Sequence, residues 1–436
     1  MMSSALASQP LYLTGLRQLG YTQSSLFDQQ TIYNEVKMLT KDIGQDRTGD
    51  QSLIREINLS IIMKSLQKNA PISRAALAVL TGLNKTTVSS LVKELIDYRL
   101  VREVGLSTAT IGRPSRLLEI NPDAGIIISG EIGVDFISVM VTNSAAKVLW
   151  QQTVPLNTTL HQEQILDQTL SLLRQAAIQG QSACVQCNTL LGVAVSVPGL
   201  VDQDTGSVLL APNMGWHDIP LYAVLQDAFP DTQIFVDNEA NVAALGEYFF
   251  GVARDYSEIL YLSAGVGLGG AMVINGRVFR GRTGVAGEFG HMTMEPNGKL
   301  CTCGNRGCWE TLVNQQALFD TMRAKQSDTS EMTVQTVFRA AQEGDEAARA
   351  AFAEIGRCLG IGAASLVNAL NPDLVMLGGT MSIAGDYILP ALRRELTARA
   401  MRWNEAATDV VVAQYGSDAS LMGGVARVFQ AMRTTA

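Results

Sequence analysis

The 436-residue chain is poor in charged and aromatic side chains, which make up 17% and 6% of its residues. Its hydrophobic fraction of 47% is nonetheless that of a folded protein, so extensive disorder is excluded. No uninterrupted apolar run approaches about 18 residues, so no transmembrane helix is expected. The first residues lack a basic segment followed by an apolar one, so no secretory signal is expected either. These absences predict a cytoplasmic protein of about two or three domains.

Cysteine and histidine are also scarce, with six and three residues respectively. Because cytoplasmic thiols stay reduced, the cysteines are expected to be thiols or metal ligands rather than disulfides. Three of them closely follow His291: Cys301, Cys303 and Cys308. One imidazole and three thiolates form the closed tetrahedral set that zinc prefers, so we predict one structural Zn²⁺ per chain. A loop of unligated thiols is the alternative.

The other cysteines have no predicted role. Cys184 and Cys187 form a C-x-x-C pair without a second pair or a nearby histidine, and we interpret this pair as incidental. Cys358 lies in an apolar helical segment and is expected in the core.

The formal net charge of −8 is unevenly distributed along the chain. Residues 51–120 hold ten basic and five acidic side chains, a net charge of +5, whereas residues 1–50 carry −1 and the rest of the chain −12. A basic module before an acidic body favours nucleic-acid contact by the module. A small domain that is basic without any such contact is the alternative.

The basic module has the pattern of a winged helix-turn-helix. Helical periodicity over 52–67 precedes a short helix at 74–80, for which Ser73 is a suitable N-cap and Gly82 a left-handed terminus. A further helix is predicted from Asn84 to about Asp97, and two strands around a polar tip follow within 101–120. Four apolar residues of that helix would pack on the other two: Val88, Leu91, Val92 and Leu95.

The opposite face of this helix carries short donors and cations, which suit phosphate oxygens and base edges in a major groove. An arginine in the tip would reach phosphate or a minor groove. We therefore predict DNA contacts by Ser73, Arg74, Lys85, Thr86, Thr87, Ser89, Ser90, Lys93 and Arg113. Use of the same surface for protein contact is the alternative.

The acidic body alternates short β-branched runs with helical segments, which predicts an α/β fold with ligand loops at strand ends. Strands are expected at 125–131, 137–142, 148–154, 190–197, 233–236, 259–262 and 374–377, and helices at 162–178, 238–250 and 345–370. Asp345 suits the N-cap of the last helix. No internal repeat is visible. The predicted domains are an N-terminal extension, possibly mobile, at 1–50, the winged helix-turn-helix at 51–121 and the body at 122–436.

Several motifs of the body resemble the ROK family of repressors, open reading frames and sugar kinases. They are VPGLVD at 197–202, NMGW at 213–216, DNEAN at 237–241, GVGLGG at 265–270, EFGH at 288–291, the cysteine loop that ends at Glu310, and GG at 378–379. The resemblance covers roughly residues 51–436. Within the family, the segments 82–90 and 305–310 are most similar to the xylose-repressor branch.

The resemblance implies a two-lobed, actin-like and sugar-kinase-like α/β body with a sugar pocket between the lobes. By position in the motifs, the pocket would be lined by Asn213, Asn238, Glu239, Glu288, His291 and Glu310. Carboxylates and amides suit sugar hydroxyls, which both donate and accept hydrogen bonds. His291 would bind zinc through one ring nitrogen and face the sugar with the other. Asp237 is expected to be structural.

The segment that corresponds to the phosphate loop of the family's kinases is altered. In residues 131–136 a valine, Val134, replaces a glycine, and Asp135 would repel a triphosphate. We therefore predict a sugar-responsive transcriptional regulator, not an enzyme, that binds operator DNA as a homodimer or a dimer of dimers without membrane association. The alternatives are a sugar kinase with an attached DNA-binding module, and a regulator that is controlled by a protein partner. Few cations adjoin the motifs, which favours a neutral sugar such as xylose or glucose.

Overall fold

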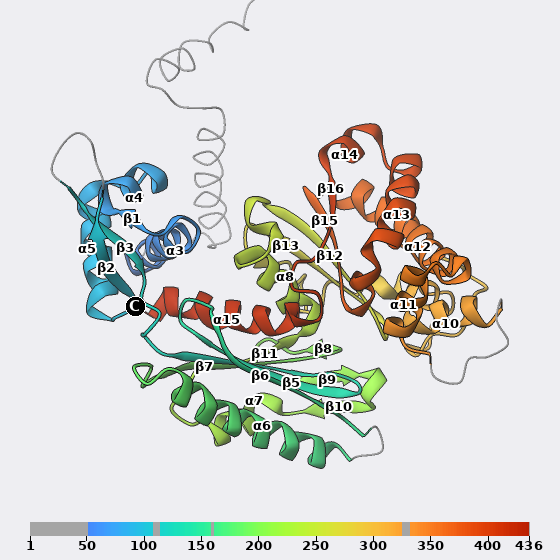
Figure 1. The fold of residues 1–436 in the computed structure, drawn as a ribbon, viewed down its shortest axis with the longest axis horizontal. Coiled ribbons are helices and arrows are strands. Elements are labelled where there is room, and N and C mark those ends of the chain that lie inside the picture. The colour runs from blue at the N-terminus through green and yellow to red at the C-terminus, as the bar shows by residue number, and fades with distance from the viewer. Residues whose placement is uncertain (1–50, 108–113, 158–160, 325–331, 436) are drawn as a thin grey trace, which may run out of the picture. The chain divides into compact units, whose positions relative to one another are not determined.

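The structure is a computed structural model that describes residues 51–107, 114–157, 161–324 and 332–435 (Figure 1). The chain forms two compact units. The first comprises the residues up to Asn121 and those from Arg433 onward, and the second comprises Pro122–Met432. The predicted Arg113 contact and the N-terminal extension lie outside the described residues.

The first unit is a helical bundle with a small sheet. Its helices are α3 Gln51–Asn69, α4 Arg74–Thr81 and α5 Lys85–Asp97, and its strands are β1 Ile72–Ser73, β2 Val101–Leu106 and β3 Arg116–Ile120. The strands pair antiparallel in the order β1-β3-β2. The predicted inner face of α5 is buried, and so are apolar side chains of the other elements, among them Leu59, Ile62, Leu66, Leu77 and Leu118.

The second unit contains two lobes, each built on a five-stranded sheet. The sheet of the first lobe has the order β11-β7-β4-β5-β6. Its strands are β4 Ile126–Ile132, β5 Phe136–Asn143, β6 Val148–Pro155, β7 Leu190–Val197 and β11 Ile234–Asn238. The helices α6 Gln162–Ala183 and α7 Leu221–Ala228 lie on one side of it, and α8 Glu239–Phe249 and α15 Ala419–Thr435 lie on the other (Figure 1). A small sheet, β10-β9-β8, follows β7 and consists of β8 Leu200–Val201, β9 Val208–Ala211 and β10 Trp216–Ile219.

The sheet of the second lobe has the order β14-β13-β12-β15-β16. Its strands are β12 Glu258–Ala264, β13 Leu268–Ile274, β14 Arg277–Val278, β15 Leu374–Gly378 and β16 Asp409–Val412. The associated helices are α9 Glu310–Val313, α10 Gln315–Arg323, α11 Val334–Glu343, α12 Glu346–Leu370, α13 Gly385–Arg399 and α14 Arg402–Ala407. The single-turn 3₁₀ segments are η1 Pro212–Met214, η2 Val252–Asp255, η3 Phe289–His291, η4 Thr380–Ala384 and η5 Gly416–Asp418.

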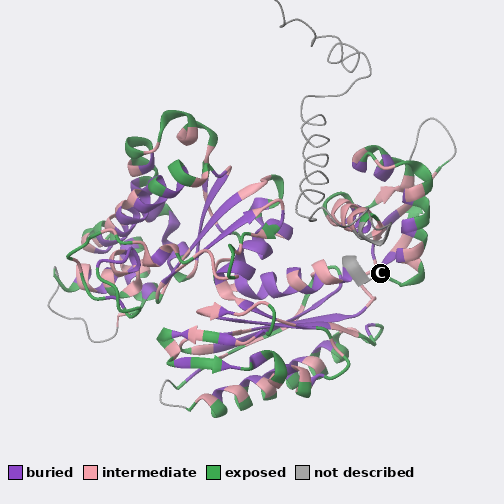
Figure 2. Ribbon diagram, turned by 180° about the vertical axis from the view of Figure 1, so that it is seen from behind, coloured by how far each residue is buried: buried purple, intermediate pink, exposed green. Residues whose placement is uncertain are grey.

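The two lobes share one topology. In each sheet the first three strands form an antiparallel meander, and two later strands add in parallel beside the first strand of the meander. The central strands are buried, as the purple strands in Figure 2 show. The lobes thus form a structural repeat that the sequence does not reveal, and the predicted two-lobed fold is confirmed.

Helix α12 is long and apolar enough to cross a membrane. Among the single helices of the described residues, it alone has this length and hydropathy. Within the structure, 67% of its most apolar window is buried. It packs on α13 and carries core residues such as Phe352, Ile355 and Leu359. Asp345 caps it, since its Oδ1 accepts hydrogen bonds from the amides of Ala347 and Ala348. The helix therefore serves as the central core helix of the second lobe.

Candidate functional site

A cavity of about 390 Å³ lies between the two lobes of the second unit. Its walls are loops at strand ends: the β4–β5 turn and residues 198–200 from the first lobe, and residues 265–270, 288–291 and 379–380 from the second. All six residues that the motifs place in a sugar pocket line this cavity: Asn213, Asn238, Glu239, Glu288, His291 and Glu310. The structure therefore brings together residues that are up to about a hundred positions apart in the sequence.

Asn238 and Glu239 are positioned by the start of α8. The Asn238 Oδ1 accepts hydrogen bonds from the amides of Ala240 and Asn241, at 2.8 and 3.1 Å, and so caps the helix. Its Nδ2 donates to the Gly199 carbonyl at 3.0 Å and to Glu239 Oε2 at 2.9 Å. The amide side chain therefore fixes the adjoining carboxyl group relative to a loop of the cavity.

Burial raises the pKa of Glu239 to about 8. Hydrogen bonds from the backbone of Glu239 and Ala240 oppose this shift, and the carboxylates of Glu131 and Glu288 reinforce it. At neutral pH the carboxyl group is therefore mostly protonated and can donate as well as accept a hydrogen bond.

Glu310 links the cavity to the cysteine loop. It is only 9% exposed, and its Oε2 accepts a hydrogen bond from the Leu268 amide at 3.1 Å. The other oxygen, Oε1, lies 3.7 Å from the Cys301 sulfur. Gly267 makes this arrangement possible, because a Cβ atom at that position would stand 2.5 Å from Glu310 Oε2.

Glu131 is a cavity residue that the motif-based set does not contain. Burial raises its pKa to about 7; a hydrogen bond from the Ser420 hydroxyl opposes the shift and the charge of Asp418 reinforces it. Its buried Oε2 has no hydrogen-bond partner among the residues that the structure describes. Its position at the start of residues 131–136, the segment predicted to correspond to the phosphate loop of the family's kinases, was the one sequence signal that pointed to it.

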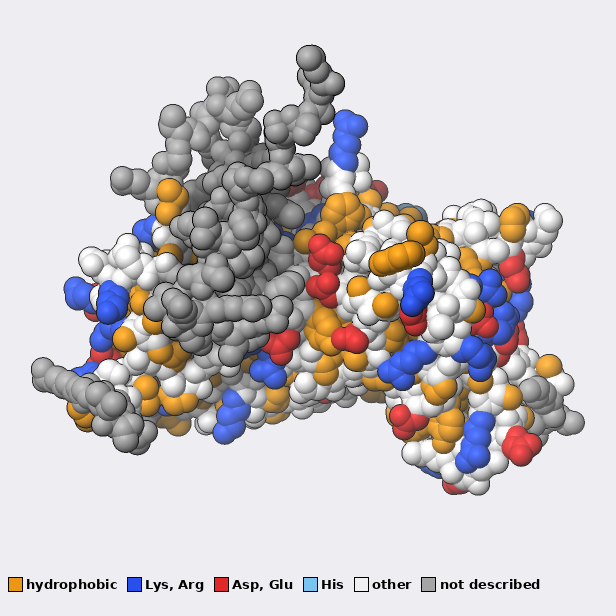
Figure 3. All heavy atoms as spheres, turned by 90° about the horizontal axis from the view of Figure 1, so that it is seen from above, with side chains coloured by type: hydrophobic (Ala, Val, Ile, Leu, Met, Phe, Trp, Pro, Cys, Tyr) orange, Lys and Arg blue, Asp and Glu red, His pale blue; other side chains and the backbone are white. Residues whose placement is uncertain are grey.

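The described lining of the cavity contains no lysine or arginine. It contains five acidic residues: Glu131, Asp135, Glu239, Glu288 and Glu310. Arg280 is not part of this lining; it binds the buried Asp237 in β11 through both carboxylate oxygens, at 3.0 and 2.5 Å. Acidic and basic side chains are interspersed on the protein face shown in Figure 3. The described cavity lining is thus acidic and contains no lysine or arginine.

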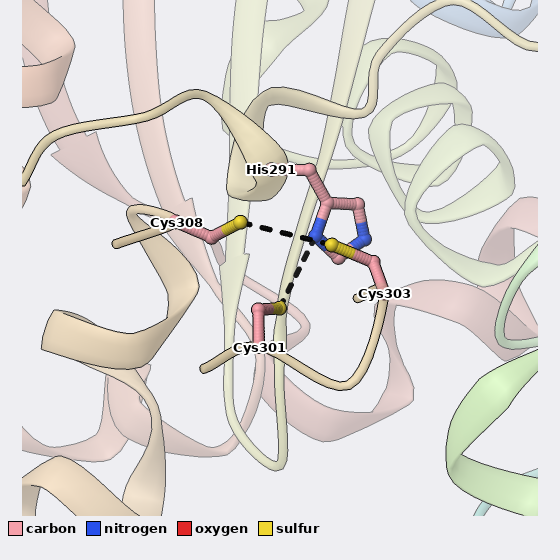
Figure 4. A group of neighbouring side chains, drawn as sticks. All are labelled: His291, Cys301, Cys303 and Cys308. Atoms are coloured by element: carbon pink, nitrogen blue, oxygen red, sulfur yellow. Dashed lines mark hydrogen bonds between the residues drawn. The ribbon is translucent and has the colours of Figure 1, made fainter. Parts of the chain in front are cut away.

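The cysteine loop brings four potential metal ligands together. One ligand atom from each of His291, Cys301, Cys303 and Cys308 lies within 4.8 Å of the others, and their side chains converge in Figure 4. The Nδ1 atom of His291 is 3.7 Å from the Cys301 sulfur, and the sulfurs of Cys303 and Cys308 are also 3.7 Å apart. Tetrahedral zinc with Zn–S bonds near 2.3 Å would separate its ligands by roughly 3.8 Å. The predicted Cys/His cluster is therefore confirmed as a possible metal site.

The remaining ring nitrogen of His291 faces the cavity side of the cluster. Its Nε2 lies 3.7 Å from Glu288 Oε2. The loop itself turns at Gly307, whose φ of 64° favours glycine and where a Cβ atom would collide with the Glu295 carbonyl. A histidine bound to a metal through Nδ1 would thus have its other nitrogen held beside a cavity carboxylate.

Cys184 and Cys187 differ from the sequence interpretation. Their sulfurs form a disulfide, so the prediction that the pair is incidental and that the chain has no disulfides is wrong. The end of α6 explains the difference, because it turns the chain so that the two Cα atoms come within 5.3 Å. Cys358 is buried in α12, as predicted.

In the first unit, α5 presents the predicted recognition face to solvent. Lys85, Thr86, Ser89, Ser90 and Lys93 are exposed, and Thr87 is half-buried. The helix begins after Asn84, whose Oδ1 accepts a hydrogen bond from the Thr87 amide at 2.8 Å. A regular helix with an exposed polar face is the geometry that enters a major groove.

Three of the predicted DNA-contacting residues also make side-chain contacts within the unit, and one of them, Lys93, forms an ion pair with Asp97 at 3.7 Å. Ser73 caps α4, because its Oγ accepts a hydrogen bond from the Ala76 amide at 3.2 Å. Arg74 forms an ion pair with Glu103 at 3.0 Å. The side chains of Ser73 and Arg74 therefore have structural partners at the start of α4.

The fold and these sites define a chain that joins a winged helix-turn-helix domain to a sugar-kinase-like body. The description of the ROK family matches residues 127–431, and that of winged helix-turn-helix DNA-binding domains matches residues 54–102. The chain belongs to the ROK family, as its motifs predict.

The chain is similar to proteins that are described as transcriptional regulators and to one that is described as a kinase. The xylose repressor of Caldicellulosiruptor bescii is 33% identical over 395 residues, which cover 88% of this chain and 98% of that protein. A crystal structure of a ROK family transcriptional regulator, a homolog of the Escherichia coli MLC protein, is 27% identical with a TM-score of 0.74 and covers 87% of this chain and 97% of its own. A ROK family glucokinase from Streptomyces griseus, in complex with glucose and AMPPNP, is 30% identical with a TM-score of 0.61; the match covers 69% of this chain and 98% of that one.

Proposed function

We propose that this chain is a sugar-responsive transcriptional repressor, which binds operator DNA through α5 and releases it when a monosaccharide occupies the cavity. The observation that carries the proposal is the combination, in one chain, of an exposed recognition helix and a cavity lined by carboxyl and amide groups. The likeness to repressors over most of the chain supports it. By linkage, sugar and operator must then weaken each other's binding.

The sugar would be held by hydrogen bonds from both lobes. Asn213, Asn238, Glu239, Glu288, His291 and Glu310 line the cavity and offer the paired donors and acceptors that vicinal hydroxyls require. The protonated carboxyl of Glu239 supplies a donor among acceptors. Because the described lining holds five acidic residues and no lysine or arginine, it favours an unphosphorylated sugar over a sugar phosphate.

Zinc would be held by His291 and the three cysteines, whose spacing suits it. When bound, it supplies a fixed structural centre without an open coordination position. The His291 ring would then be oriented by coordination through Nδ1, and the Leu268 amide would hold Glu310 beside the ligand Cys301.

The kinase alternative is less well supported. The altered phosphate-loop segment turns between β4 and β5 and places Val134 and Asp135 in the cavity wall. A carboxylate there opposes a nucleotide triphosphate, and no lysine or arginine of the described lining offsets it. We therefore expect a regulator without kinase activity.

The regulator would act in the cytoplasm as a dimer, because paired recognition helices read the two halves of a palindromic operator.

The test is operator binding measured by fluorescence anisotropy, with a duplex selected from a randomised library, against a panel of monosaccharides and their phosphates. One neutral sugar should weaken binding at least about tenfold, and its phosphate ester should not. Release by the phosphate ester alone would contradict the predicted cavity chemistry. ADP production from ATP that depends on the sugar would contradict the repressor proposal and favour the kinase alternative.

A further inference from the structure

We propose that Cys184 and Cys187, at the end of α6 in the second unit, form a reversible thiol–disulfide switch, and that its state changes operator binding. The pair is distinct from the cysteines of the metal cluster, which lie in a loop of the other lobe. The oxidant would be a low-molecular-weight disulfide, and the reductant a cellular dithiol.

The backbone holds the two cysteines in reach of each other. Cys184 is the C-cap of α6, and the Cys187 amide donates a hydrogen bond to the Cys184 carbonyl at 2.9 Å. This turn sets the Cα atoms 5.3 Å apart, within the range that a disulfide spans. Because the turn depends on a backbone hydrogen bond, the same geometry is available to the dithiol form.

The two sulfurs differ in access. Cys187 is 1% exposed and belongs to the core of the first lobe, whereas Cys184 is half-buried. Between them, Val185 is 81% exposed and Gln186 is also exposed, so the turn projects into solvent. A small oxidant therefore reaches Cys184 first, and Cys187 is placed to resolve the product.

The reaction is a two-step thiol–disulfide exchange. The Cys184 thiolate attacks the small disulfide and releases one thiolate, which takes up a proton. The Cys187 thiolate then attacks the Cys184 sulfur of the mixed disulfide and releases the second thiolate. Two protein thiols lose two electrons and two protons, and the small disulfide becomes two thiols.

The cysteine pair lies beside the residue at which the chain enters the second unit. The Cys187 sulfur lies 3.6 Å from the carbonyl oxygen of Pro122, the first residue of that unit. Only the thiol has a proton to donate to this oxygen, so reduction adds a weak hydrogen bond and oxidation removes it. Asn121, the residue before Pro122, is the last residue of the segment that forms the winged helix-turn-helix unit. The state of the pair would thus alter the freedom with which two recognition helices match their half-sites; this step rests on the proposed operator binding.

The chemical test uses the full-length chain, incubated with glutathione disulfide or with dithiothreitol, then alkylated and analysed by mass spectrometry. We expect an internal disulfide in the peptide that contains residues 184–187, reversed by dithiothreitol. Cys187→Ser should stop at a mixed disulfide on Cys184, and Cys358→Ser, the matched control, should behave as the wild type. A persistent mixed disulfide in the wild type would overturn the switch. A metal ion retained by the reduced pair, with oxidation blocked, would also overturn it and indicate a second metal site.

The regulatory test compares operator affinity of the oxidised and reduced chains. We expect a difference of roughly threefold, the size of one weak hydrogen bond, and no difference in Cys187→Ser. Equal affinities would refute the regulatory role and leave operator binding intact. Absence of binding in both states would instead refute the proposed function, while the mass spectra still decide the chemistry of the pair.

Discussion

The recognition helix of the first unit and the cavity of the second use polar side chains in opposite ways. Lys85, Ser89 and Ser90 on α5 are exposed. Glu239 and Glu310 in the cavity are instead tied to neighbouring backbone or side-chain groups and to a glycine-rich loop. Substitutions on the helix should therefore change DNA binding without changing the fold. Substitutions in the cavity should instead change sugar binding and the local structure together.

The largest effect is expected for Cys301→Ser. The cysteine is buried and lies beside both His291 and Glu310, so its loss should abolish metal binding and misplace the Glu310 carboxylate. We expect bound zinc to fall from one per chain to none, with loss of the sugar response. Elemental analysis and calorimetry with the sugar measure the two effects. Cys358→Ser is the matched control for loss of a buried thiol, and zinc retained near one per chain in Cys301→Ser would show that the ligand set is wrong.

Glu239→Ala should weaken sugar binding by roughly 10- to 100-fold, the range for a hydrogen bond to a strongly polar group. Operator binding without sugar should be unchanged, because Asn238 rather than Glu239 caps α8. Titration calorimetry measures the sugar affinity. Glu239→Gln sharpens the test, since at pH 7 it resembles the protonated carboxyl group and should bind nearly as the wild type does. A strong loss in Glu239→Gln at pH 7 would mean that the charged form binds the sugar.

Lys85→Ala should weaken operator binding several-fold and reduce the magnitude of its salt dependence by about one unit of slope. The side chain is exposed, so thermal stability should not change. Anisotropy titrations over a range of salt concentrations measure both quantities. Lys147→Ala, which removes an exposed lysine of the second unit, is the control; an equal loss there would mean that the effect reflects total charge alone.

Ser73→Ala should destabilise the first unit by about 1 kcal/mol, the usual value of an N-cap. The hydroxyl caps α4 by accepting from the Ala76 amide. Urea unfolding followed by circular dichroism should show an earlier transition of the first unit and an unchanged second unit. Ser73→Asp, which keeps a capping acceptor, should restore stability, and failure of that rescue would argue against capping.

A pH dependence of the stability of the second unit is also expected. Burial raises the pKa of Glu131 to about 7 and that of Glu239 to about 8, from 4.5. The folded state then binds more protons than the unfolded state, so stability is full below about pH 4.5 and is lost as the pH rises through 7 to 8. Scanning calorimetry should show a lower unfolding temperature at pH 8.5 than at pH 6. Glu131→Gln should flatten this dependence, and an unaltered slope would exclude Glu131 as its source.

Local signals made much of the fold predictable. The sequence placed α5 and α12 to within a residue, because Asn84, Asp345 and regular apolar spacing mark their limits. Strand β1 was missed, since two residues become a strand only by pairing with β3, more than forty positions later. The shared topology of the lobes was missed for the same reason, because strand order depends on pairings between distant segments.

The cavity was predictable only through family motifs. Those motifs correctly grouped six lining residues, but composition and spacing alone would not have brought Asn213 to Glu310. Glu131 was missed because its neighbours are apolar strand residues, and its role emerges only when Ser420 approaches from α15. The C-x-x-C spacing of Cys184 and Cys187 was visible in the sequence, but the bond between them depends on the turn that ends α6, and the spacing alone does not reveal that turn.

Gly267 has a consequence for the genetics of the response. Gly267 lies so close to the Glu310 carboxylate that even a methyl group at this position would displace the carboxylate. Gly267 itself has no side chain that could contact the sugar. An alanine there would leave the recognition helix unchanged and produce a non-inducible allele. A screen for strains that stay repressed in the presence of the sugar should therefore recover glycine positions of this loop as readily as the residues that face the sugar.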